Sequence, residues 1–413
     1  MENRLHKYRK QVLIASLLFI GAALQFAHAQ QKVAEWLSDS IIQRYQPTID
    51  VLTHHGWDHS NSIVMHAMAK VYLQTNNPQY LAYVQKYADD YINADGSING
   101  LLTTLDGMHP AVLCLFLYQQ TGDKKYQKAA TTMRDHLLGK NGQKSQFNKT
   151  QDGIFWNKNN AKYQDVASVD GLYMKDPFLV RYGLMFDQPE LVDASVEQVL
   201  KLAQRSFNIR TNLAFHAWDA TGTRDWADPI TGQATQHWSR ASGWFAMALV
   251  DILEYLPKSH PDYNKVAHIF QRLALGLKNA QHRQNGLWYQ VLDQAHKPDN
   301  YPEISGSGMI VYALTKGVQL QLLADEYAQI AQKAWVSMQD YIKTYSDGGP
   351  QITSVAPGMS SKLDYAAYVA VKPIEVPRSQ TKQYSHGYVG VLMAASVIEY
   401  QGLNNSAFVT AGS

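Results

Sequence analysis

The sequence contains a single cysteine, Cys114, among 413 residues. One thiol cannot form an intramolecular disulfide, and its position inside the apolar run 112–117 is typical of a small core residue rather than a catalytic thiol. The sequence has no arrangement of Cys and His at zinc-ligand spacing. It therefore predicts no metal site and no cofactor.

The first residues have the pattern of an export signal. A basic segment with Lys7, Arg9 and Lys10 precedes an apolar run over 12–24, which is too short to span a bilayer, and Ala27-His28-Ala29 follows as a cleavage pattern. We expect residues 1–29 to be a signal peptide and the protein to be periplasmic or secreted. An uncleaved N-terminal anchor is the alternative, and it also places the folded part outside the cytoplasm.

No block of Lys and Arg remains once this segment is set aside. Removing residues 1–29 takes four basic residues and one acidic residue, so the formal charge falls from +2 to −1. A near-neutral chain argues against a nucleic-acid or anionic-membrane surface and against membrane insertion after cleavage. The sequence also lacks a Pro/Gly/Ser-rich linker, and we expect residues 30–413 to form one domain.

Helical periodicity dominates this region, whereas strand-like alternation is scarce. Apolar residues recur at a period of 3.6 over 64–72, 245–253, 310–318 and 388–395, which gives each segment one apolar face. Many of the helices end in Gly, Asn or Pro and lead directly into another helix, as at Gly122-Asp123 and Asn77-Pro78. These patterns predict helical hairpins repeated along the chain.

Unusual residues precede the apolar helices at six places. The six entrances lie at 57–59, 105–109, 169–171, 238–240, 305–307 and 384–387. If each hairpin supplies one inner and one outer helix, six hairpins close into an all-α (α/α)6 barrel with parallel inner helices, and all the entrances meet at one mouth. The positive helix ends there suit an anionic ligand. Asp and Ser before a helix are also ordinary N-caps, but Trp, His and Arg are poor caps.

Four motifs occur in an order that resembles unsaturated rhamnogalacturonyl hydrolases, glycoside hydrolase family 105. They are Asp170-Gly-Leu-Tyr-Met174, His216-Ala-Trp-Asp219, Trp238-Ser-Arg240-Ala-Ser-Gly243-Trp244 and Gly286-Leu-Trp-Tyr-Gln290. Asn300-Tyr301 and Ser305-Gly-Ser307 fit as well, so the resemblance covers most of the chain from Trp57 to the last helix. It implies an (α/α)6 barrel without a metal that hydrates the C4=C5 double bond of a terminal 4,5-unsaturated uronic acid.

The resemblance also implies which residues carry the reaction. Asp170 corresponds to the acid/base and Asp106 to the second aspartate. The substrate contacts expected from the motifs and the entrances are His216, Trp238, Arg240, Trp244, His109, Trp57, Tyr173 and Met174, with His59 and His386 as weaker lining candidates. The segment 107–110 and Lys175 depart from the family pattern near the expected pocket, which leaves substrate preference open.

Hydration of an enol ether needs a proton delivered to C4 and a water that reaches C5, and one carboxyl group can do both in turn. We expect Asp170 to do this. Asp106 is expected to hold ring hydroxyls and to keep Asp170 protonatable, against the opposite effect of Arg240. Arg240 positions a carboxylate or forms a structural ion pair, and His216 binds substrate or is a core histidine.

The expected partner is an oligosaccharide with an unsaturated uronate at its non-reducing end, most simply an unsaturated galacturonyl residue on rhamnogalacturonan fragments. An unsaturated glucuronyl hydrolase acting on ulvan or glycosaminoglycan fragments is the alternative, because C4 is sp² in both rings. A non-catalytic sugar-binding barrel is a further alternative, which the presence of both Asp106 and Asp170 disfavours.

Overall fold

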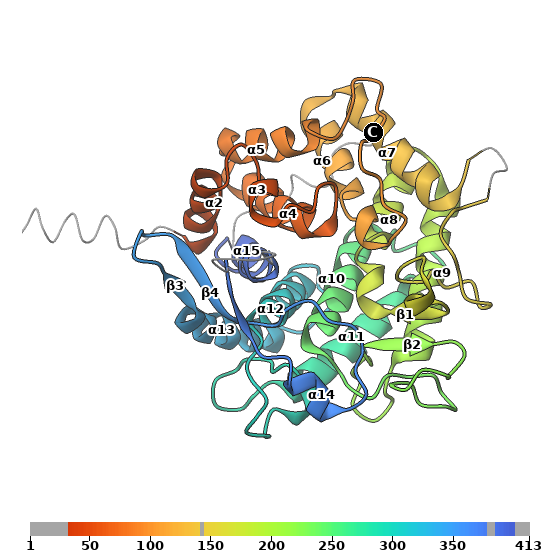
Figure 1. Ribbon diagram of the computed structural model, residues 1–413, viewed down its shortest axis with the longest axis vertical. Helices are drawn as coiled ribbons and strands as arrows, with labels where there is room; N and C mark the ends of the chain where they lie inside the picture. Colours follow the sequence, from red (N-terminus) through yellow and green to blue (C-terminus); the bar gives the residue numbers. More distant parts are fainter. Residues whose placement is uncertain (1–31, 141–143, 378–384, 401–413) are drawn as a thin grey trace, which may run out of the picture.

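Six helices form a closed inner ring in the computed structural model, which describes residues 32–140, 144–377 and 385–400 (Figure 1). In ring order they are α4 (His59–Thr75), α6 (Ala111–Thr121), α8 (Asp176–Met185), α10 (Ser239–Tyr255), α12 (Ile304–Gln319) and α15 (His386–Ile398). Each packs against the next, and α15 returns to α4. The predicted (α/α)6 barrel is confirmed, whereas the predicted signal peptide 1–29 lies outside the described residues.

Outer helices cover this ring, and five of them directly follow the inner helix on which they pack. They are α5 (Pro78–Asp89), α7 (Lys124–Leu138), α9 (Pro189–Ser206), α11 (Tyr263–Ala280) and α13 (Glu326–Met338). Side chains cap two of the turns: Asn77 accepts from the amide of Gln79 at 3.0 Å, and Asp123 accepts from that of Lys125 at 2.9 Å. The predicted helical hairpins therefore exist at these positions.

The sixth pair differs from the prediction, because it is not a hairpin. Its outer helix is α2 (Val33–Arg44), near the start of the described chain, and its inner helix is α15, near the end. Glu399 accepts hydrogen bonds from the amides of Val33 and Ala34, both at 3.0 Å, while the hydroxyls of Tyr45 and Tyr388 lie 3.0 Å apart. The two helices are therefore antiparallel, and they close the barrel as a seam.

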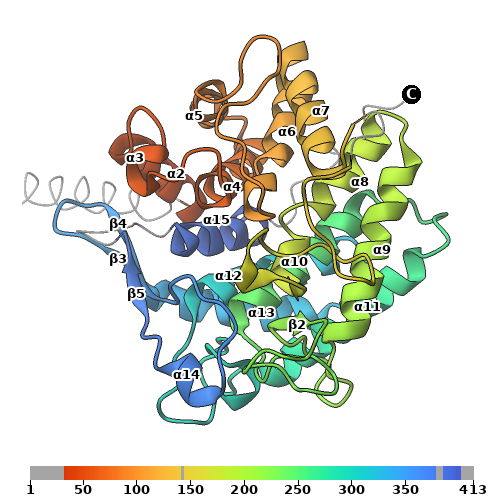
Figure 2. The same cartoon turned by 45° about the vertical axis from the view of Figure 1, so that its right-hand side comes forward.

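The remaining elements are short and occupy the loops (Figure 2). Strand β1 (Val166–Ser168) pairs antiparallel with β2 (Ala217–Asp219), and a second sheet has the order β3 (Ile342–Thr344), β4 (Pro350–Val355), β5 (Ile374–Val376). The short helices are α3 (Asp50–Thr53), η1 (Asp106–Met108), η2 (Ala161–Tyr163), η3 (Val169–Leu172), η4 (Leu292–Gln294), η5 (Gln339–Tyr341) and α14 (Tyr365–Val369). None of the helices within the described ranges has the length and apolar character needed to cross a membrane.

Glycines bring the backbones of α12 and α15 into direct contact. A Cβ atom at Gly308 would lie 2.1 Å from the carbonyl oxygen of Gly390, and one at Gly390 would lie 2.6 Å from that of Ser305. Backbone atoms cannot move aside as a flexible side chain can. The side of the ring next to the seam therefore depends on residues without a Cβ.

Substitution Gly308→Ala should destabilise the protein by about 2 kcal/mol or more, because the added methyl group forces the two helices apart. The measurement is the shift of the urea midpoint in equilibrium unfolding. Gln332→Ala, at an exposed position of α13, serves as the control and should change the midpoint little. An unchanged midpoint for Gly308→Ala would show that the contact can relax at no cost.

Candidate functional site

The amino-terminal ends of the inner helices surround a cavity of about 430 Å³. Five of the six predicted entrances contribute to its wall. The contributing residues are His59 and Ser60, Asp106, Asp170 and Met174, Trp238, Arg240 and Trp244, and His386. The inner helices therefore begin at the same end of the barrel. At the sixth entrance, Ser305 and Ser307 are buried and do not line the cavity.

A second cavity, of about 270 Å³, adjoins the first. It extends toward β2 and the loop after it, where His216, Arg224 and Trp226 form the wall. The two cavities share Asp170 together with Asn157, Lys162, Tyr163, Met359 and Ser360. Asp170 therefore lies at the junction of one continuous cleft.

The carboxyl group of Asp170 is buried in the short helix η3. The pairing of β1 with β2 leads into this turn, and the amide of Val169 bonds to the carbonyl of His216 at 3.3 Å. A Cβ at Gly171 would lie 2.7 Å from Oδ1 of Asn157, so the turn packs tightly against that side chain. Within the described residues, Oδ1 of Asp170 has no hydrogen-bond partner.

Burial raises the pKa of Asp170 to about 6, and the charge of Asp106 acts in the same direction. Hydrogen bonding from the backbone, together with the positive charges of Lys158 and His59, opposes the rise only in part. A carboxyl group with this pKa is protonated in part of the molecules near neutral pH. Asp170 can therefore donate a proton and accept one back, as a general acid/base requires.

Asp106 forms an ion pair with Lys158, at 2.8 Å between Oδ2 and Nζ. A bridge between Thr104 and Lys158 aligns the two segments, and the amide of Leu105 bonds to the carbonyl of Asn157 at 3.2 Å. Asp106 raises the pKa of Lys158 and so keeps the ammonium charged. Sequence reasoning missed Lys158 because no motif marks it and only the folded loop brings it beside Asp106.

His59 adds positive charge to the same wall. Its Nδ1 lies 2.7 Å from Oδ1 of Asp58. Burial lowers the pKa of His59, but the carboxylates of Asp106 and Asp58 outweigh it, so the pKa is raised overall. The ring of His386, 5.5 Å away, is kept neutral because burial holds its pKa well below the usual value.

Trp238 and Trp244 supply an aromatic wall in the larger cavity. Trp238 donates its Nε1–H to Gln290 at 3.1 Å, and its ring lies 4.6 Å from that of His216. The ring of Trp244 stacks at 5.0 Å on Tyr173, which anchors it to the barrel core. Met174 completes the apolar part of the wall.

Arg240 binds the backbone of the loop that follows β4, and the ion pair considered from the sequence stays a prediction. Its guanidinium donates to the carbonyls of Ala356 and of Pro357, the latter at 2.7 Å, and lies 4.7 Å from the Trp238 ring. Glu303, the N-cap of α12, accepts from the amide of Ala356 at 3.1 Å. The loop residues 358–360 and 362 that follow line the cavity. Glu303 and this loop carried no recognisable signal in the sequence.

His216 lies in the smaller cavity, where its Nδ1 is 2.8 Å from the hydroxyl of Tyr368. Burial, assisted by the charge of Arg240, lowers the pKa of His216 to about 3. The imidazole is therefore neutral, and it can offer a hydrogen bond but no charge. The ring is buried and also lines the cleft, and its contact with substrate stays a prediction.

Three predicted contacts lie in the core instead of the cavity wall. Trp57 is buried and stacks at 5.7 Å on Tyr87. His109 and Tyr173 stack on each other at 5.3 Å, and Ser62 lies 2.7 Å from Nδ1 of His109. The prediction for these residues needs correction, because an entrance residue can point along the barrel axis as well as into the mouth. His109 and Tyr173 pack beneath the cavity, whereas Trp57 packs outward against Tyr87 of the outer helix α5.

Lys175 directly follows Met174, which lines the cleft, but its own side chain lies in the core. It is buried, forms an ion pair with Asp176 and lies 5.3 Å from the ring of Phe155. It does not line either part of the cleft. This departure from the family pattern is therefore accommodated in the core and does not bear on the cleft.

Comparison with known proteins identifies a family over the whole helical ring. Residues 33–400 match the model of Glycosyl Hydrolase Family 88. A solved structure of a family 105 glycoside hydrolase from C. acetobutylicum superposes with a TM-score of 0.79 at 30% identity, covering 89% of this chain and 99% of that one.

Two curated relatives are similar over different lengths. A protein of Agrobacterium fabrum is 36% identical over 160 residues, which are 38% of this chain and 66% of that protein. The match thus spans slightly less than two thirds of that relative. The unsaturated rhamnogalacturonyl hydrolase YesR of Bacillus subtilis is 24% identical over 320 residues, 76% of this chain and 84% of that enzyme.

Substitution Asp170→Asn should stabilise the protein at pH 7.5 and not at pH 4. The folded-state pKa of about 6 exceeds the ordinary value of 3.8, so ionising Asp170 costs the folded state stability as pH rises through this window. The cost is complete above about pH 6 and reaches about 3 kcal/mol, which the neutral amide avoids. Urea midpoints at both pH values measure it, with exposed Asp340→Asn as the control. Equal midpoints for wild type and Asp170→Asn at pH 7.5 would contradict the raised pKa.

Proposed function

The chain belongs to Glycosyl Hydrolase Family 88, and we propose that it removes a 4,5-unsaturated uronic acid from the non-reducing end of an oligosaccharide. The observation that carries this proposal is the buried, protonatable Asp170 beside the Asp106–Lys158 pair at the junction of the cleft. An ordinary glycosidase needs two carboxyl groups, one as acid and one as base or nucleophile. Here Lys158 already neutralises the second carboxyl group, which favours a reaction in which one carboxyl performs both proton transfers.

The unsaturated ring fits the larger part of the cleft. Trp238 and Trp244 offer apolar faces to a flat ring, and the positive charges of His59 and Lys362 face the same space as its carboxylate would. Asp106 accepts hydrogen bonds from ring hydroxyls while Lys158 holds it in place. The next sugar extends past Asp170 into the smaller part, toward Arg224 and Trp226.

In the proposed reaction, Asp170 first gives its proton to C4, and the positive charge that forms at C5 is shared with the ring oxygen. Water then adds to C5 and passes a proton to the Asp170 carboxylate, which restores the acid. The resulting hemiketal opens to a ketone at C5 and a hemiacetal at C1, and the hemiacetal expels the neighbouring sugar. One water is consumed, and no oxidant or reductant is required.

The parent polysaccharide is the finer part of the proposal. We favour an unsaturated galacturonyl residue on rhamnogalacturonan fragments, because the relative named for that activity is similar over 76% of this chain. We also propose export to the periplasm or medium, on the basis of the signal pattern in residues 1–29. Export would place the enzyme where large polysaccharides are first cut.

The wild-type protein should remove the ultraviolet absorbance of the C4=C5 double bond when it is mixed with lyase-treated rhamnogalacturonan. Asp170→Asn should lose this activity by about 10²-fold or more, because the amide cannot supply the proton. Asp340→Asn is the matched control and should retain full activity. Digests of ulvan and chondroitin tested in parallel report the substrate class, and stable absorbance with every digest would reject the proposed function.

The pH dependence of kcat/KM should respond in opposite directions to two substitutions at the ion pair. Asp170 must be protonated to begin the reaction, so activity falls as pH rises past its pKa of about 6. Asp106→Asn removes a neighbouring negative charge and should move this alkaline limb to lower pH by about one unit. Lys158→Met removes a positive charge and should move the limb to higher pH. Limbs that stay fixed in both variants would show that Asp106 and Lys158 do not tune Asp170.

A further inference from the structure

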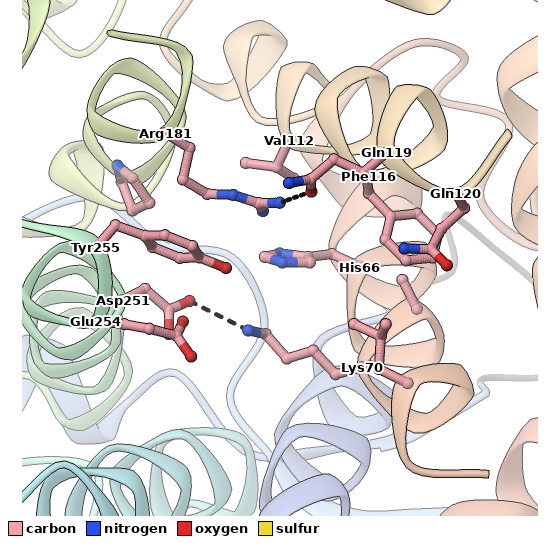
Figure 3. Close-up of a pocket in the computed structure, with 13 residues that line it drawn as sticks. His66, Lys70, Val112, Phe116, Gln119, Gln120, Arg181, Asp251, Glu254 and Tyr255 are labelled. Atoms are coloured by element: carbon pink, nitrogen blue, oxygen red, sulfur yellow. Dashed lines mark hydrogen bonds and ion pairs between the residues drawn. The ribbon is translucent and has the colours of Figure 1, made fainter. Parts of the chain in front are cut away.

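A third cavity, of about 170 Å³, lies toward the carboxyl-terminal ends of the inner helices, and Figure 3 shows the side chains that line it. It is lined by residues of α4, α6, α8 and α10, most of them toward the carboxyl-terminal ends of α4, α6 and α10. The polar lining residues are His66, Lys70, Gln119, Gln120, Arg181, Asp251, Glu254 and Tyr255. The cavity shares no lining residue with the catalytic cleft, although Val112 and Pro177 in the first turns of α6 and α8 bring it close beneath the mouth. None of its residues takes part in the proposed reaction.

Three cations and two carboxylates meet in this region. Lys316 forms ion pairs with both carboxylates. Its Nζ lies 3.0 Å from Oδ1 of Asp251 and 2.6 Å from Oε2 of Glu254. It also donates to the Tyr312 hydroxyl at 3.0 Å. Burial, reinforced by the charge of Lys70, holds the pKa of His66 well below its usual value, so His66 adds no charge. One positive charge is therefore left over, carried by Lys70 and Arg181.

Lys70 and Arg181 are incompletely matched by the groups around them. The Nζ of Lys70 is 3.6 Å from Oδ2 of Asp251, longer than a hydrogen bond. Arg181 donates from Nη2 to Gln119 at 2.9 Å and lies 5.0 Å from the ring of Tyr255. Among the described residues, its buried Nε has no acceptor. A buried donor on a group that stays charged at every accessible pH is costly unless a ligand satisfies it.

We propose that this rear cavity binds a small organic carboxylate. The oxygens of a carboxylate match the excess charge of Lys70 and Arg181, which enter from the two sides of His66 in Figure 3. The cavity walls at Leu73, Val112 and Phe116 suit a compact carbon body. The carbonyl ends of α4 and α6 bring partial negative charge to the same space, which favours a monoanion over a phosphate dianion.

A stacked column separates this ligand from the catalytic cleft. His66 lies 3.3 Å from the Tyr173 hydroxyl, and Tyr173 stacks on Trp244, which lines the mouth. A carboxylate at the rear therefore does not touch Asp170, and its binding can be measured without any substrate. Binding at the rear cavity is therefore tested independently of the reaction at the mouth.

Calorimetric titration of the full-length protein with isobutyrate tests the rear cavity directly. We expect one saturable site in the wild type, weakened about tenfold or more in both Arg181→Met and Lys70→Met, because each substitution removes a charge-assisted hydrogen bond. The control Arg272→Met, outside the cavity, should bind as the wild type does. Absence of binding in the wild type, or binding unchanged in both variants, would overturn the proposal.

Titrations with two further compounds, inorganic phosphate and galacturonate, identify the chemical class of the ligand. Inorganic phosphate should bind more weakly than isobutyrate, and equal or tighter binding of phosphate would overturn the preference for a carboxylate. Galacturonate that loses affinity in Arg181→Met would identify a uronic acid as an occupant. Galacturonate that binds equally in wild type and Arg181→Met, while isobutyrate is lost in the variant, supports a smaller acid at the rear cavity.

Lysine labelling of the wild-type protein provides a second readout of binding that needs no variant. Burial lowers the pKa of Lys70 to about 8, against the opposing charge of Asp251, so its amine is reactive at that pH. A bound carboxylate raises this pKa, and saturating isobutyrate should slow acetylation of Lys70 about fivefold at pH 8. Exposed Lys333 is the internal control. Equal labelling of Lys70 with and without isobutyrate would contradict binding at this site.

Discussion

Closure of the helical ring is the constraint on which the rest of the structure depends. The antiparallel packing of α2 on α15 joins the two ends of the described chain, and Glu399 fixes it by capping the first turn of α2. On the other side of α15, Gly308 and Gly390 allow the backbone of α12 to approach. Because each inner helix alternates with an outer helix, all the inner helices begin at one end, and closure of the ring brings those ends around a single mouth. The cleft is a consequence of that geometry.

The cleft holds several charged groups, and burying them lowers the stability of the fold. Asp170 is buried without a full set of hydrogen bonds, and its raised pKa reflects energy that the rest of the barrel supplies. The positive charges of Lys158 and His59 offset the negative charge of Asp106. Asp170 is the acid in the wall that has no ion-pair partner of this kind among the described residues. Arg240 donates hydrogen bonds to the backbone of the loop after β4, and the residues that follow in this loop line the cleft.

The two ends of the barrel differ in electrostatic character because all the inner helices run in the same direction. Amino-terminal helix ends face the mouth, while carbonyl ends face the rear cavity, where Lys70 and Arg181 also lie. Stacked rings of His66, Tyr173 and Trp244 fill the axis between these regions. His109 and Tyr173, which the sequence pattern assigned to the mouth, belong to the packing beneath it.

The sequence by itself determined the helical class, the repeat of inner and outer helices and the motifs that carry Asp106 and Asp170, because periodicity and local turn chemistry are encoded over short stretches. Tertiary structure alone decided the rest. The pairing of α2 with α15 joins segments more than 300 residues apart, and Lys158, Glu303 and the loop after β4 reach the cleft only through loop packing. Trp57 was misplaced because periodicity gives the face of a helix but not the direction in which an entrance side chain points. Contacts between distant segments leave no local pattern from which they could be read.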